Sequence, residues 1–204
     1  GTKILELDID TGLTKKEFSL PDNPNFGWLS VQDEYLVATI APIAVKISGK
    51  DKEKSEAVDS RFASGSRQLT VFNRKTGKLL WTRDAKFNFC HNNIALGTDS
   101  IYVIDSLTEA RLKALNRRGM KPKGNPSLSA LDLKTGRVIW QSEEDIFGTF
   151  LNYSSEHDLL LQAGSAFRDR AKDDIGKGMI AYQGRSGKIM WANRDLSYNG
   201  PCLL

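Results

Sequence analysis

His91 is the residue whose type could most readily do chemistry. It lies in Phe89-Cys90-His91-Asn92-Asn93, where an imidazole that titrates near neutral pH stands beside amides. With Asn92 it could contact a ligand or act as an acid or base. The simpler interpretation, which we favour, is a histidine hydrogen-bonded within the wall of a central channel, because buried polar groups are usually satisfied locally.

Other residues join His91 as candidates because they stand at the expected starts of comparable strands. If those strands converge, their first residues share one mouth with His91 and could contact the same cofactor. The candidates at these starts are Trp28, Thr149 and Asn199. By contrast, His157 lies in Ser154-Ser155-Glu156-His157-Asp158, which reads as a connection between strands, so we expect a turn residue there.

Three tryptophans, Trp81, Trp140 and Trp191, could stack on a planar ligand. Each comes four residues after a glycine, at the same point of a repeated pattern. A recurring position of this kind indicates a packing role rather than a cofactor site.

The pattern itself is clearest at 128–140, LSALDLKTGRVIW. Asp132 and Thr135 can hydrogen-bond the backbone of a tight turn, and Gly136 supplies the positive φ that a hairpin loop with a bulge needs. The stretch therefore predicts a β-hairpin that ends near Trp140. It recurs at 69–81, with Thr76, Gly77 and Trp81, and at 179–191, with Gly187 and Trp191.

A weaker copy opens the chain. Asp8 stands four residues before Gly12, as Asp132 stands before Gly136, but Lys16 occupies the tryptophan position. Repeats made only of strands, none of which can bury its apolar face alone, favour a β-propeller with one four-stranded blade per repeat.

The pattern A-x-D-x-x-T-G-K-x-x-W resembles the repeat motif of pyrroloquinoline-quinone-like (quinoprotein dehydrogenase-like) β-propellers. Ala130, Asp132, Thr135, Gly136 and Trp140 follow it, and the 179–191 copy departs from it with glutamine for the aspartate and serine for the threonine. The resemblance covers nearly the whole chain and implies that the tryptophans pack between neighbouring blades with their N–H bonded to backbone. It also implies a bacterial, periplasmic or exported protein. It does not choose between members that carry a quinone with calcium and members that carry no cofactor.

The predicted fold class is therefore all-β, a partial β-propeller of four-stranded antiparallel blades within one domain, 1–204. Residues 1–20 form the outer hairpin of an incomplete blade, 26–84, 87–143 and 147–195 form blades, and 199–204 begin another. A short helix is expected near 107–118, since Ser106 and Glu109 form a capping box and Gly119 with Pro122 provides a stop. The remaining blades are expected to belong to a longer parent chain.

Long polar insertions interrupt each predicted blade between its second and third strand: residues 46–66, the segment between Asp105 and Leu128, and the loop between Gly164 and Met179. Alternating strand direction brings all of them to one face, where repeat proteins commonly build a binding surface. A protein or polysaccharide partner is expected there. The basic stretch 111–123 could bind an anionic polymer or lipid headgroups, although a solvated charged face is the commoner arrangement.

Composition and charge exclude several classes. The net charge of +4 is too small to demand nucleic acid, and no aromatic residue is interleaved with the basic stretch for base stacking. No apolar run of the roughly 18 residues that a membrane helix requires occurs. Cys90 and Cys202 fall in non-adjacent predicted blades, so we expect no disulfide, and neither cysteines nor acidic residues form a recognisable metal set.

These observations favour a non-catalytic propeller region that serves as a binding scaffold, with no catalytic residue and no metal site assigned. The alternative is a fragment of a dehydrogenase that oxidises an alcohol or sugar with pyrroloquinoline quinone and calcium near His91 and Asn92.

Overall fold

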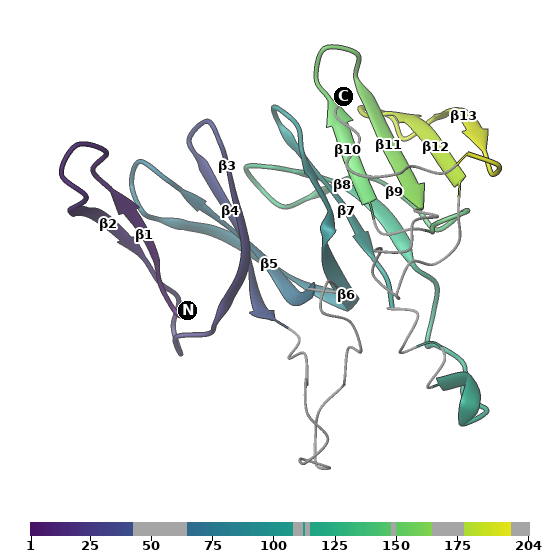
Figure 1. The fold of residues 1–204 in the computed structure, drawn as a ribbon, viewed down its shortest axis with the longest axis horizontal. Coiled ribbons are helices and arrows are strands. Elements are labelled where there is room, and N and C mark those ends of the chain that lie inside the picture. Colours follow the sequence, from purple (N-terminus) through teal and green to yellow (C-terminus); the bar gives the residue numbers. More distant parts are fainter. Residues whose placement is uncertain (43–64, 108–111, 113–114, 148–149, 165–177, 197–204) are drawn as a thin grey trace.

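The computed structural model describes residues 1–42, 65–107, 112, 115–147, 150–164 and 178–196. Within them, thirteen strands follow one another in antiparallel pairs, and helical residues occur only at Leu112 and 115–117. The sheets stand side by side in chain order (Figure 1). The predicted all-β class, with a short helix near 107–118, is confirmed.

The strands form three sheets. The first pairs β1 (Ile4–Leu7) with β2 (Thr14–Phe18). The second has seven strands, β3 (Phe26–Gln32), β4 (Tyr35–Pro42), β5 (Gly65–Asn73), β6 (Leu79–Leu96), β7 (Ser100–Asp105), β8 (Ser127–Asp132) and β9 (Val138–Ser142). The third has four, β10 (Phe150–Ser154), β11 (Leu159–Gly164), β12 (Gly178–Gln183) and β13 (Ile189–Asn193).

The four hairpins that carry the repeated motif share one geometry. Their glycines have positive φ, 69° at Gly12, 76° at Gly77 and 70° at both Gly136 and Gly187. Each glycine N–H donates to the carbonyl four residues earlier at 2.8–2.9 Å, and each hairpin shifts register just before its turn. Glycine is favoured at these positions because most L side chains are strained in this conformation.

The side chains that close these turns also correspond. Asp132 Oδ1 accepts from the Thr135 N–H at 2.7 Å and from its hydroxyl at 2.6 Å. The copy at 179–191 keeps the bond between the two side chains, since the Ser186 hydroxyl donates to Gln183 Oε1 at 2.8 Å. The longer glutamine therefore replaces the aspartate without loss of the turn.

Strand β6 departs from the sequence-based division into blades. The sequence pattern ends one predicted blade at Asp84 and begins the next at Phe87, whereas β6 is one strand of 18 residues that pairs with β5 and then with β7. Its first part completes the set β3-β4-β5-β6, and its last part begins the set β6-β7-β8-β9.

Asp105 stabilises β6 at the point where it passes between these two sets. Ser66 pairs with Phe89 and Gln68 with Asp84, so several β6 residues oppose a single residue of β5. The N–H groups of Lys86, Phe87 and Asn88 donate there to the Asp105 carboxylate at 2.6, 2.9 and 3.0 Å. The carboxylate thus supplies acceptors for backbone donors in the irregular part of the β5–β6 ladder.

The apolar core lies between neighbouring sets of strands. Phe18 of β2 packs with Phe72 of β5, and Tyr102 of β7 packs with Tyr182 of β12 in a cluster that includes Trp140. The helical turn lies at the end of the sheets opposite the hairpin turn between β1 and β2 (Figure 1). None of the described helical residues forms a helix long and apolar enough to cross a membrane.

Candidate functional site

His91 on β6 lies beside two buried hydroxyl groups. Its Nε2 is 2.9 Å from Ser66 Oγ and 3.3 Å from Thr39 Oγ1. Ser66 Oγ donates to Thr39 Oγ1 at 2.9 Å, and Thr39 Oγ1 also accepts the Trp28 N–H at 2.8 Å. We call Gly27, Thr39, Ser66 and His91 the His91 cluster.

Four adjacent strands of one sheet each contribute one member of the His91 cluster. Gly27 comes from β3, Thr39 from β4, Ser66 from β5 and His91 from β6. A Cβ at Gly27 would lie 2.6 Å from Ser66 Oγ, 2.9 Å from Thr39 Oγ1 and 3.0 Å from His91 Cε1. Only glycine allows β3 to approach the polar groups this closely.

A serine beside a histidine is the arrangement of a nucleophile and its base. Here, however, Ser66 and Thr39 are both 0% exposed, so neither hydroxyl is open to solvent as the strands are arranged. Burial lowers the pKa of His91, which keeps the imidazole neutral at pH 7. The hydrogen bonds among Trp28, Thr39, Ser66 and His91 join four strands.

Among the residues predicted to share a site with His91, those that the structure describes are Trp28 and Asn92. Trp28 is the one that bonds to Thr39, as His91 does. Its backbone N–H bonds to Thr39, and its indole packs against the apolar cluster around Val71 and Val103. Asn92 is exposed. Thr149 and Asn199 lie outside the described residues.

Thr39 and Ser66 were not among the predicted site residues. Thr39 is the one serine or threonine in the apolar run Tyr35–Pro42, and this isolated aliphatic hydroxyl in a buried strand was a usable signal. Ser66 was assigned to the polar segment 46–66, yet it is 0% exposed and belongs to β5. Its role depends on pairing across strands, which the local sequence does not record.

The indoles of Trp81 and Trp140 lie on the motif turns of the next set of strands. Trp81 Nε1 donates to Leu133 O at 3.0 Å, and Trp140 Nε1 donates to Gly184 O at 2.6 Å. The ring carbons lie so close to the turn glycines that a Cβ at Gly136 or Gly187 would stand 2.6 Å from the indole. The indole can pack against the turn because the glycine has no side chain. We call this contact between indole and turn glycine the indole seat.

The residue that accepts each indole is itself fixed by its own set of strands. The Leu133 N–H donates to Asp99 O at 2.9 Å, and the Gly184 N–H donates to Asp158 O at 2.8 Å. The same bond recurs from Arg74 N–H to Glu34 O at 2.6 Å. The carbonyl that accepts the indole N–H of the preceding hairpin is therefore held in place by its own set of strands.

The remaining candidates do not gather into a second site. His157 is exposed in the turn between β10 and β11. Exposed basic residues stand at the last position of the helical turn and just after it: Arg117, Arg118, Lys121 and Lys123. Cys90 is not in a disulfide, and Cys202 lies outside the described residues. The described residues contain no group of three or more His, Cys, Asp or Glu that could hold a metal ion.

A planar quinone does not fit the His91 cluster as these strands form it. Both hydroxyls are fully buried and already hydrogen-bonded to one another, and the partly buried Trp28 indole packs against an apolar cluster. Pyrroloquinoline quinone carries three carboxylates, which would also need accessible hydrogen-bond donors from the protein. The cluster offers it none through Ser66 or Thr39.

No protein-family model and no curated protein matches the sequence. Solved structures of similar fold include a europium-containing methanol dehydrogenase (14% identity, TM-score 0.55, 94% of this chain and 38% of that one). They also include the Neurospora crassa Pan2 WD40 domain (12%, 0.53, 98% and 47%) and the Dos1 propeller (9%, 0.51, 97% and 43%). The chain thus spans less than half the length of each of these three. At such identities the likeness concerns fold alone, and it identifies the chain as a partial β-propeller.

Proposed function

We propose that this partial propeller is a non-catalytic scaffold that binds other macromolecules by its surface. The observation that carries the proposal is the His91 cluster, in which a half-buried imidazole is hydrogen-bonded to a serine and a threonine that are fully buried and bonded to each other. These groups stabilise the sheet β3-β4-β5-β6. The dehydrogenase alternative rests on fold likeness alone.

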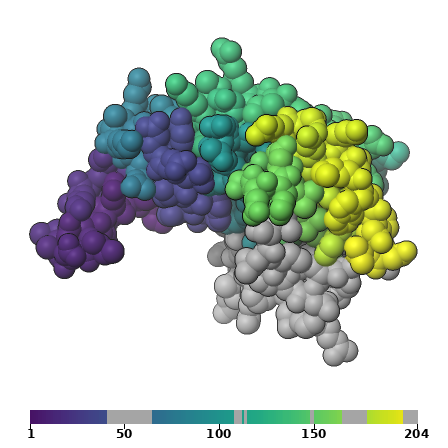
Figure 2. Space-filling view, turned by 90° about the horizontal axis from the view of Figure 1, so that it is seen from above, coloured from purple at the N-terminus to yellow at the C-terminus, as the bar shows by residue number. Residues whose placement is uncertain are grey.

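The motif tryptophans support a role for this chain in assembly. We infer that they act as docking residues between blades, since Trp81 and Trp140 each bond the following turn. Trp191 is the third of the series and is 43% exposed, with Met190 58% exposed beside it. The turn at Gly12 has nothing within 4 Å of a would-be Cβ. These surfaces lie at the two ends of the row of sheets, purple and yellow in Figure 2, and further blades of the same polypeptide are the partners that fit them.

A second partner surface is proposed at the end of the sheets that carries the long connections. Those connections leave β4 at Pro42, β7 at Asp105 and β11 at Gly164, the ends away from the glycine turns. The helical turn lies on this side (Figure 1), and exposed basic residues stand at its end and just after it: Arg117, Arg118, Lys121 and Lys123. An acidic protein surface or an acidic polysaccharide has the complementary charge.

The experiment titrates pyrroloquinoline quinone with calcium into the chain and into the longest version of the polypeptide that contains it. The scaffold proposal expects no saturable 1:1 binding by calorimetry, and it expects His91→Asn to leave the heat signal unchanged. Tight stoichiometric binding that His91→Asn abolishes would overturn the proposal in favour of the dehydrogenase.

A further inference from the structure

Lys16 occupies the position at which the other hairpins have tryptophan, four residues after the turn glycine. Its Nζ donates to Arg74 O at 2.8 Å and also to the Lys75 carbonyl. Arg74 follows Asn73 just as Leu133 follows Asp132 and Gly184 follows Gln183. The ammonium therefore uses the same acceptor position as the indoles of Trp81 and Trp140.

The stem of Lys16 also takes the place of the ring. Its Cδ would lie 3.7 Å from a Cβ at Gly77, an ordinary van der Waals contact, whereas indole carbons come within 2.6 Å at Gly136 and Gly187. A lysine can cover apolar surface with its methylene groups while its head keeps polar partners. Lys16 does so here with backbone carbonyls instead of water.

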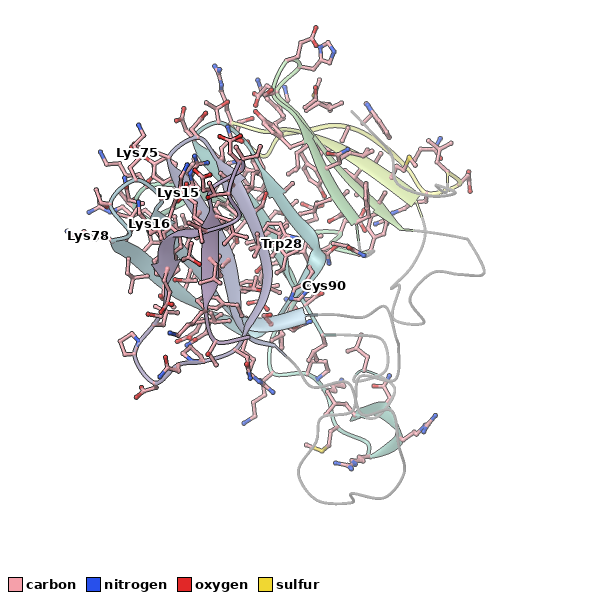
Figure 3. All side chains as sticks on the ribbon, turned by 60° about the vertical axis from the view of Figure 1, so that its left-hand side comes forward. Lys15, Lys16, Trp28, Lys75, Lys78 and Cys90 are labelled. Atoms are coloured by element: carbon pink, nitrogen blue, oxygen red, sulfur yellow. The ribbon has the colours of Figure 1, made fainter. Side chains whose placement is uncertain are left out.

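The charges around Lys16 do not account for its placement. Figure 3 shows Lys15, Lys16, Lys75 and Lys78 at one corner of the molecule. Lys15 pairs with Asp8 at 2.6 Å and Lys75 with Glu34 at 3.9 Å, which partly neutralises the corner. The ammonium of Lys16 instead donates to two backbone carbonyl oxygens, those of Arg74 and Lys75.

We propose that the turn Asn73–Gly77 forms a binding site for a primary alkylammonium group, and that Lys16 fills this site to dock the β1–β2 hairpin onto the neighbouring sheet. A two-stranded sheet is at best marginally stable alone, so the hairpin depends on what holds it. Phe18 and Leu20 supply apolar contact with Leu36, Ile40 and Phe72. The ammonium supplies the directional contact that an indole provides elsewhere.

The test measures amide hydrogen exchange in β1 and β2 of the 204-residue chain. Lys16→Met keeps the stem and removes the donors, and exchange in the hairpin should accelerate about ten- to hundredfold, as expected for loss of a hydrogen bond from a charged group. Lys16→Trp should restore protection by returning the indole. The control is Lys78→Met, which removes an exposed neighbouring lysine and should leave these amides unchanged.

Chemical rescue distinguishes an ammonium site from a general effect of charge. In Lys16→Ala, n-butylammonium should restore protection of the hairpin amides in a saturable manner, while tetramethylammonium at the same ionic strength, which has no N–H donor, should not. Wild-type exchange rates in Lys16→Met would overturn the proposal. Equal protection of the hairpin amides by the two ammonium cations in Lys16→Ala would also overturn it. If Lys16→Met proves too unstable to study, Lys16→Trp decides: unprotected hairpin amides in that variant refute the equivalence.

Discussion

The seat of Trp81 on Gly136 can be tested by adding one methyl group at four equivalent glycines. Gly12, Gly77, Gly136 and Gly187 have nearly equal φ, so replacement by alanine imposes the same backbone strain at each, about 1–2 kcal/mol. Their surroundings differ. A Cβ at Gly12 meets nothing within 4 Å, and at Gly77 it meets Lys16 Cδ at an ordinary 3.7 Å.

At Gly136 the new methyl group would stand 2.6 Å from Trp81 Cδ2 and 2.9 Å from Cε3, so the ring has to move. Overpacking of this kind costs about 1–3 kcal/mol. Displacement of the ring also breaks the bond from Trp81 Nε1 to Leu133 O, which contributes about 0.5–1.5 kcal/mol. Gly136→Ala should therefore lower the free energy of unfolding by about 2–4 kcal/mol more than Gly12→Ala.

Urea denaturation followed by circular dichroism gives the required comparison. The expected order of destabilisation is Gly12→Ala and Gly77→Ala small, Gly136→Ala and Gly187→Ala large, because Trp140 meets Gly187 as Trp81 meets Gly136. Equal losses at all four glycines would mean that strain alone acts, and the account of the indole seats would be wrong.

Three further predictions concern single interactions. Trp140→Phe leaves the Gly184 carbonyl without its donor and should cost about 1–3 kcal/mol in urea denaturation, while Trp191→Phe, at an exposed ring, should change the midpoint little. Asp105→Asn replaces one of the two carboxylate oxygens, which together accept three backbone N–H groups, by an NH2 donor. It should lower the free energy of unfolding by about 1.5–3 kcal/mol in the same measurement. A wild-type midpoint would contradict the role of Asp105 at β6. Since burial lowers the pKa of His91 in the folded chain, the unfolded chain binds the proton more strongly, and the free energy of unfolding should fall as the pH drops below 6.5 toward the folded pKa; His91→Gln should reduce that slope in denaturation curves recorded from pH 7.5 to 5.

The hairpins could be predicted from sequence because their determinants are local. Asp132, Thr135 and Gly136 close a turn through hydrogen bonds between residues three or four positions apart. Such short-range contacts can be predicted from the local sequence. The substitution pair Gln183 and Ser186 shows the limit of the motif, since the turn persists although two of its letters change.

The His91 cluster and the continuous strand β6 could not be predicted in the same way. Thr39, Ser66 and His91 are separated by 27 and 25 residues and meet only through strand register. The expected break at residues 84–87 is bridged because Asp105, which lies beyond it in β7, satisfies the backbone donors of 86–88. Long-range partners decide both features.

Strand β6 has a mechanical consequence for the protein. Because Leu79–Leu96 belongs to two successive sets of strands, no flexible joint separates them, and a pull or twist applied to one is transmitted covalently and through the ladder to the other. A split-protein reassembly cut after Asp84 would sever this shared strand, whereas a cut near residue 144, between β9 and β10, would leave every ladder intact.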